Sequence, residues 1–242
     1  MFKTEDKTLS VTQPVVFFPG TLCDERIFNA CWQFIDIPKR AFVPLQWADD
    51  LAQMQMLSAD RLQYFDEPVH LVGFSMGGYI AALTALENPG RIASVTIIAS
   101  ACDALPQEEF QQRQQTLQLI KRKQYSAMTN KRLKYFFHTS HHQHSDYLDT
   151  VAQMEKDFGA GVLAAQINAT QHRQNLLPAL AKSEFSIHLI AGEQDNLLTE
   201  SALNAMHQQL PKSDLSVIKN AGHMLPIEQP QVLAQLLASK MS

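Results

Sequence analysis

A serine at position 75 lies in the run GFSMGG (residues 73–78), which fits the pattern Gly-x-Ser-x-Gly. A serine hydroxyl attacks a carbonyl carbon efficiently only when it is exposed and placed next to a base. In this pattern a sharp strand-to-helix turn presents the hydroxyl, and glycines stand where a Cβ would clash. The apolar run 69–74 and the small-residue helix pattern 76–88 supply that context. Ser75 is therefore the candidate nucleophile.

A serine of this kind needs a histidine to take its proton and a carboxylate to orient the histidine. Asp195 follows the apolar run 186–192, and His223 follows the apolar run 215–218. Both positions come directly after expected strands, so all three groups would project from the carboxyl edge of one parallel sheet. Glu193 and Asp103 also follow expected strands and stay open as alternatives to Asp195.

Three motifs in this order, GFSMGG, AGEQD and NAGHMLPIEQP, resemble those of the α/β-hydrolase family. The resemblance covers nearly the whole chain. It implies the α/β-hydrolase fold, with a mostly parallel sheet, helices on both faces and a helical cap inserted in the chain. It also implies the catalytic roles of Ser75, Asp195 and His223.

The same resemblance points to an oxyanion loop, PGTLCD (residues 19–24), after the first core strand. In the family, two backbone N–H groups stabilise the alkoxide that forms during acyl transfer. Carried over to this chain, these are the N–H groups of Met76 and Thr21. Pro19 stands where the family usually has a histidine, so the N–H of Leu22 is the alternative to that of Thr21.

Apolar runs that predict strands alternate with patterns that predict helices, which indicates a parallel sheet between helices. The expected strands are residues 15–18, 41–45, 69–74, 94–99, 187–191 and 215–218, and the expected helices are residues 25–34, 51–65, 76–88, 200–209 and 231–240. Residues 1–14 leave room for one short strand at most. We therefore expect a sheet smaller than the eight strands usual in the family.

The alternation stops between residues 104 and 182, where helix-favouring polar stretches cover 107–123, 128–137 and 147–171. We expect a hydrolase core of residues 1–103 and 183–242 and a cap of residues 104–182 within a single domain. A cap would exclude water and contact substrate. The candidate substrate contacts are Leu22, Cys23, Phe136, Phe137, Leu197 and Leu198.

Composition is that of an enzyme with a large core: 242 residues, 45% hydrophobic, 18% charged, net charge −4. We expect no nucleic-acid or membrane partner, because there is no basic patch and no apolar run of spanning length. The polar start of the chain (residues 1–14) is unlike a secretory signal, and three sparse cysteines are typical of free thiols in a reducing compartment. These features predict a cytoplasmic protein; the oligomeric state stays open.

Four histidines, at 138, 141, 142 and 144, are close enough in sequence to suggest a metal site. Their spacing matches no paired-histidine helical motif, and the segment is rich in serine and glutamine. A solvated loop is the preferred interpretation. We expect neither a metal nor an organic cofactor.

The chemistry that these residues predict is hydrolysis of a small to medium carboxylic ester or thioester through an acyl-enzyme on Ser75. The same fold also supports hydrolysis of C–C bonds and acyl transfer to an alcohol, so both stay open. A non-catalytic ligand-binding protein that kept the same residues is the alternative from another class. The leaving group and the acyl group depend on cap loops, and the motifs do not define them.

Overall fold

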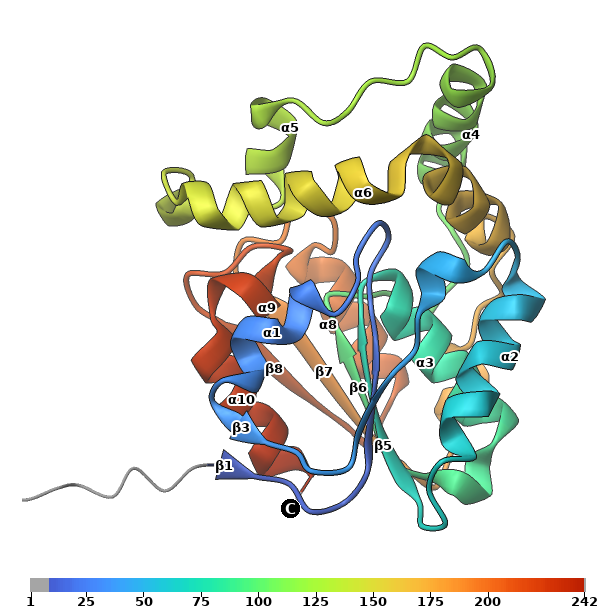
Figure 1. Cartoon of the computed structure of the whole chain (residues 1–242). Helices are drawn as coiled ribbons and strands as arrows, with labels where there is room; N and C mark the ends of the chain where they lie inside the picture. The colour runs from blue at the N-terminus through green and yellow to red at the C-terminus, as the bar shows by residue number, and fades with distance from the viewer. Residues whose placement is uncertain (1–8, 242) are drawn as a thin grey trace, which may run out of the picture.

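A computed structural model describes residues 9–241, which build a six-stranded parallel sheet between two layers of helices (Figure 1). The strand order is β4-β2-β5-β6-β7-β8, and every neighbouring pair is parallel. The strands are β2 (Val15–Phe18), β4 (Arg40–Phe42), β5 (Val69–Phe74), β6 (Ile92–Ile98), β7 (Ser186–Gly192) and β8 (Ser213–Ile218). The predicted fold class is confirmed.

Two hydrophobic clusters hold the helices on the two faces of the sheet. One face carries α2 (Leu51–Leu62), α3 (Met76–Glu87), α7 (Leu177–Leu180) and α8 (Glu200–Gln209). The other face carries α1 (Arg26–Trp32), α9 (Leu225–Glu228) and α10 (Pro230–Lys240). Because both faces are covered, the central strands are buried along most of their length and mainly apolar, without a regular alternation of apolar and polar residues.

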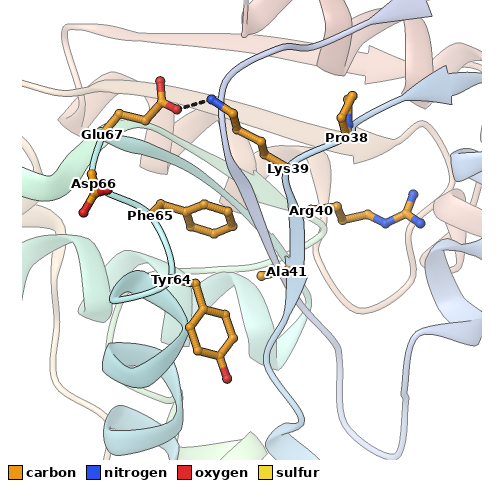
Figure 2. A pocket seen from close by; sticks show the side chains of 8 residues that line it. All are labelled: Pro38, Lys39, Arg40, Ala41, Tyr64, Phe65, Asp66 and Glu67. Carbon is orange, nitrogen blue, oxygen red and sulfur yellow. Dashed lines mark hydrogen bonds and ion pairs between the residues drawn. The ribbon is translucent and has the colours of Figure 1, made fainter.

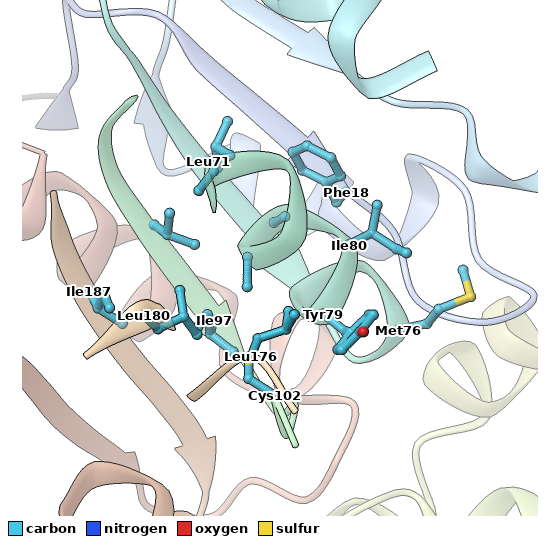
Figure 3. Packing of buried hydrophobic residues seen from close by; sticks show 14 of the residues in the cluster. Phe18, Leu71, Met76, Tyr79, Ile80, Ile97, Cys102, Leu176, Leu180 and Ile187 are labelled. Atoms are coloured by element: carbon cyan, nitrogen blue, oxygen red, sulfur yellow. The ribbon is translucent and has the colours of Figure 1, made fainter. Parts of the chain in front are cut away.

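Helix α3 is buried along most of its length, and Figure 3 shows its residues Tyr79 and Ile80 in the same hydrophobic cluster as the strand residues Leu71 and Ile97. Its small residues let the helix backbone lie close to the sheet. The side chain of Tyr79 is 2% exposed. Its hydroxyl also accepts a hydrogen bond from the N–H of Gln174 at 2.9 Å.

The cap segment lies over the carboxyl edge of the sheet (Figure 1). It consists of α4 (Gln107–Lys121), α5 (Asn130–Tyr135), the short 3-10 helix η3 (Thr139–His141) and α6 (Ser145–Thr170). Helix α6 is two helical pieces joined at Gly159, whose φ of 68° and ψ of −173° are not helical. The proposed boundaries at residues 104 and 182 stay predictions.

Three local details differ from the expectations. The strand expected at 41–45 ends at Phe42, because Pro44 has no N–H and a 3-10 helix, η1 (Leu45–Trp47), follows. A second, two-stranded sheet pairs β1 (Leu9–Ser10) with β3 (Ile35–Asp36). The helix expected at 51–65 ends at Leu62.

The short strand β1 is the only described strand before β2, as expected, and the main sheet has six strands among the described residues. The expectation that the start of the chain is unlike a secretory signal rests on residues 1–14. Of these, residues 1–8 lie outside the described residues. None of the described helices combines the length and the apolar character that a membrane-crossing helix needs.

Candidate active site

Ser75 lies at the turn between β5 and α3 with a φ of 51° and a ψ of −122°. This backbone is strained for a residue with a side chain, and neighbouring contacts keep it in place. The N–H of Ser75 donates to the carbonyl of Ile98 in β6 at 2.8 Å. A Cβ at Gly77 would lie 2.3 Å from the carbonyl oxygen of Phe18, so only glycine fits where α3 meets the end of β2.

His223 stands between Ser75 and Asp195. Its Nε2 lies 3.0 Å from Ser75 Oγ, and its Nδ1 lies 2.9 Å from Asp195 Oδ2. The ring is 4% exposed and Asp195 is 8% exposed, whereas Ser75 keeps an intermediate exposure. An ionised carboxylate only accepts hydrogen bonds, so Asp195 keeps the proton on Nδ1 and leaves Nε2 free to accept the serine proton.

Backbone donors fix the orientation of Asp195. Its Oδ1 accepts the N–H of Leu197 at 2.7 Å and the N–H of Leu198 at 3.0 Å. Neither alternative acid contacts His223. Glu193 accepts the N–H of Asn220, and the half-exposed Asp103 lies 3.7 Å from Arg173. Of the three candidates, the structure brings only Asp195 to the histidine.

The oxyanion loop lies against the turn that carries Ser75. A Cβ at Gly20 would lie 3.3 Å from the Cβ of Ser75, so the loop passes directly beside the nucleophile. Within the described residues, the N–H groups of Thr21 and Met76 donate to no acceptor. The N–H of Leu22 donates instead to Gln166 Oε1 at 2.9 Å. Thr21 and Met76 therefore have the donors that are available for an oxyanion.

A buried carboxylate that the sequence analysis missed supports the histidine loop. Glu228 accepts the N–H of Gly222 at 2.9 Å and the N–H of His138 at 2.7 Å. Its Oε2 also lies 3.0 Å from Nδ1 of His141. The signal was present: Glu228 is a lone charge in the apolar stretch that follows His223. It joins the histidine loop to the cap through short hydrogen bonds.

The solvated-loop interpretation of the histidine cluster is wrong for His141. Its side chain is 12% exposed, and its ring meets those of His144 and Tyr147 at centroid distances of 5.4 and 5.6 Å. The reason is the buried Glu228, which draws His141 into the protein. Among residues 9–241, no three His, Cys, Asp or Glu side chains are grouped in a way that could hold a metal ion.

The candidate substrate contacts have different environments. Phe137 is 1% exposed and packs within the core cluster, whereas Phe136 is half-buried with its ring centroid 6.3 Å from that of His223. The carbonyl of Phe136 accepts the N–H of His223 at 2.8 Å. Leu197 is 53% exposed and Leu198 is buried. Their contact with substrate stays a prediction.

The three cysteines are free and buried. Cys23 lies in the oxyanion loop, Cys31 in α1 and Cys102 after β6. Burial raises the pKa of each thiol to about 12. Because the thiolate is the reactive form, these thiols are inert in the folded protein.

A surface groove lies at the opposite edge of the sheet and has no part in this site. Figure 2 shows its walls, which carry an ion pair between Lys39 and Glu67. Residues 38–41 precede or begin β4 and residues 64–67 precede β5, so the groove is at the amino edge. Ser75 lies at the carboxyl edge.

Residues 47–230 match a family model described as alpha/beta hydrolase fold. The matched segment is well over half of the 242 residues and includes Ser75, Asp195 and His223. The chain belongs to the α/β hydrolase family. The resemblance that the three motifs indicated is thereby confirmed.

Named relatives and solved structures agree with an α/β hydrolase. Monoacylglycerol lipase ABHD6 of Bos taurus is 24% identical over 188 residues, which are 71% of this chain and 54% of that protein. The chain spans about half the length of the curated relatives it matches. A thermophilic esterase from Thermogutta terrifontis superposes with a TM-score of 0.81 at 18% identity, covering 95% of this chain and 89% of that one. The enol-lactonase of Burkholderia xenovorans gives 0.79 at 14% identity, covering 95% and 91%.

Proposed function

We propose that this α/β hydrolase cleaves carboxylic esters through an acyl-enzyme on Ser75. The observation that carries the proposal is the continuous hydrogen-bonded chain from Ser75 Oγ through both nitrogens of His223 to Asp195. The available N–H groups of Thr21 and Met76, beside the serine, add the donors that the reaction needs. Thioesters of similar size belong to the same proposal, because they react through the same acyl-enzyme.

The reaction follows from the positions of the protons. His223 Nε2 takes the proton of Ser75 as Oγ bonds to the carbonyl carbon, and the carbonyl oxygen becomes an alkoxide near Thr21 and Met76. As the alkoxide collapses, the ester C–O bond breaks and His223 gives its proton to the leaving alcohol. Water then repeats both steps, with His223 as base, and releases the acid. Asp195 stabilises the imidazolium in each half-reaction.

The names of the relatives support this reaction class. Two proteins named above carry the words lipase and esterase. Their identity with this chain is low, so the names bear on the class of bond and not on the substrate. Modest substrate size is our own expectation from the cap that covers the carboxyl edge.

Labelling with a fluorophosphonate tests the nucleophile. We expect one adduct per chain, on the peptide that contains Ser75, and hydrolysis of p-nitrophenyl esters by the unmodified protein. Ser75→Ala should abolish both. Ser94→Ala is the matched control, because Ser94 Oγ also lies 2.7 Å from a histidine nitrogen, that of His70, but Ser94 is 2% exposed.

Several results would contradict the proposal. An adduct on another serine, or full turnover by Ser75→Ala, would remove Ser75 from the reaction. If the protein binds esters, thioesters or diketones without turning them over, the result would support the alternative that it is a non-catalytic ligand-binding protein. Turnover of diketones alone, or acyl transfer to added alcohol without release of acid, would move the protein to the other two reaction classes.

A further inference from the structure

The cap holds the oxyanion loop at Leu22. The φ of Leu22 is 53°, a left-handed backbone that is unfavourable for a residue with a Cβ. Its N–H donates to Gln166 Oε1 of α6 at 2.9 Å. Its side chain is 4% exposed and packs with Leu163 and Ile167 of the same helix. One polar and one apolar contact with α6 therefore keep this strained conformation.

The other end of the Gln166 amide has no partner. Gln166 is 0% exposed, and its Nε2 has no acceptor among the described residues. The Leu22 N–H is a donor, so the atom facing it must be the amide oxygen, and Nε2 keeps both protons unused. Leaving a buried amide N–H without an acceptor costs roughly 1–3 kcal/mol. An acceptor from outside the chain would remove that cost.

This amide lies near the reacting serine. A Cβ added at Gly20 would lie 3.3 Å from the Cβ of Ser75, and Leu22 is two residues further on. Because consecutive Cα atoms are about 3.8 Å apart, the Cα of Leu22 lies at most roughly 7.6 Å from that of Gly20. A substrate bound covalently at Ser75 therefore lies against the loop whose Leu22 N–H donates to the Gln166 amide.

The charges nearby favour a neutral acceptor. Arg26, the cation next to this loop, donates to Asp24 at 2.7 Å and to Asp157 of α6 at 2.7 Å. Two carboxylates thus surround one guanidinium, and the group carries a net negative charge. A substrate carboxylate would be repelled there, whereas a hydroxyl, ether or carbonyl oxygen would not.

We propose that Gln166 selects substrates that carry a neutral oxygen acceptor in addition to the scissile ester. Its Oε1 positions the oxyanion loop through Leu22, and its Nε2 donates to that second oxygen. The inference rests on the proposed ester hydrolysis and names the kind of ester that the site takes.

Isosteric ester pairs test the inference. On the acyl side, p-nitrophenyl methoxyacetate and p-nitrophenyl butyrate differ only by an ether oxygen in place of a CH2 group. On the alcohol side, 2-methoxyethyl butyrate and butyl butyrate differ in the same way. For each pair we take the ratio of kcat/KM for the ether ester to that for the alkyl ester. Comparing this ratio between protein variants cancels the intrinsic reactivity of the esters.

Gln166→Met keeps the volume of the side chain but removes the donor. In one of the two pairs the ratio should fall about fivefold, because one neutral hydrogen bond contributes roughly that factor. The pair that responds shows whether the second oxygen of the substrate lies on the acyl side or on the alcohol side. Loss of loop positioning lowers kcat for both members of a pair and leaves the ratio unchanged. Gln111→Met, the same substitution at an exposed site of α4, is the control and should change neither value.

Gln166→Glu keeps the test decisive if the methionine variant does not fold. Its carboxyl group still accepts the Leu22 N–H, but once ionised it has no proton to donate. The ratio should then fall as the pH rises, relative to wild type. Unchanged ratios in both pairs, from a wild-type enzyme active on esters, would overturn the role of Gln166 alone. A wild type inactive on every ester would overturn the proposed function and this inference together.

Discussion

The sheet carries two histidine–aspartate pairs of nearly equal geometry at its two ends. At the carboxyl end, His223 Nδ1 lies 2.9 Å from Asp195, and at the amino end, His188 Nδ1 lies 2.8 Å from Asp214. The difference is at the other ring nitrogen. That of His223 faces Ser75 at 3.0 Å, whereas that of His188 is buried without a partner among the described residues.

The contrast teaches that a histidine–carboxylate contact does not define a reactive site. Near His188, the neighbouring strand residues His70 and Ser94 also form a 2.7 Å contact, but Ser94 is 2% exposed and lies within β6, where it pairs with His70 of β5. Ser75 differs because its turn lifts it out of the strand. The carboxyl end of the sheet therefore differs from the amino end in two respects: its serine hydroxyl is exposed, and two backbone donors lie beside that hydroxyl.

The largest expected effect comes from removing each aspartate charge in turn. Asp195→Asn should lower kcat for p-nitrophenyl butyrate by roughly four orders of magnitude, because the amide favours the wrong tautomer of His223. Asp214→Asn should leave kcat within a few-fold of wild type. Circular dichroism spectra should show that both variants are folded. Comparable losses of kcat in the two variants would abolish the distinction between the pairs.

A substitution at Gly77 tests whether the position of the turn that exposes the Ser75 hydroxyl matters for turnover. A Cβ at Gly77 would lie 2.3 Å from the carbonyl oxygen of Phe18. Gly77→Ala should push α3 away from the oxyanion loop and lower kcat about a hundredfold, the usual cost of losing one oxyanion donor. Gly90→Ala is the control, since its Cβ would meet nothing within 4 Å. Wild-type kcat in Gly77→Ala would mean that the turn tolerates a wider separation than the structure implies.

The amino end of the sheet should matter for stability in acid instead of for turnover. Burial, together with the charge of His188, lowers the pKa of His70 from 6.5 to about 4. Between these values the unfolded chain binds the proton and the folded chain does not, so the free energy of unfolding decreases as the pH falls from 6.5 to about 4. Below that range both states are protonated and the loss is complete, at about 3 kcal/mol.

Urea unfolding across this pH range measures the effect. His70→Gln should flatten the pH dependence by that amount, whereas His172→Gln, at an exposed site, should not change it. If the free energy of unfolding of His70→Gln fell with pH as steeply as that of wild type, folding would not lower the pKa of His70. Activity of His70→Gln near neutral pH should equal that of wild type.

The fold was predictable because its determinants are local in sequence. The buried strands β2, β5 and β7 are mainly apolar, and the motifs around Ser75, Asp195 and His223 each follow a mainly apolar run. The end of β4 was missed because Pro44 interrupts a run that is otherwise apolar.

The contacts of the cap were not predictable in the same way. Gln166 is one of many polar residues on a helix, and its partner Leu22 is 144 residues away, so no spacing pattern indicates the pair. Glu228 was closer to being found, because a buried charge five residues after His223 requires partners. Two of its partners, however, are His138 and His141 of the cap, far away in the chain.

The three buried thiols give this protein its own reporters of local opening. Cys23 monitors the oxyanion loop, Cys31 the first helix, and Cys102 the junction between the sheet and the cap. A thiol reagent modifies each one only when its surroundings open, so the order of modification, followed by mass spectrometry, ranks these regions by their opening free energy. If the cap holds the oxyanion loop, binding of an ester analogue should slow modification at Cys23 more than at Cys31. The protein thus allows its dynamics to be measured without any engineered label.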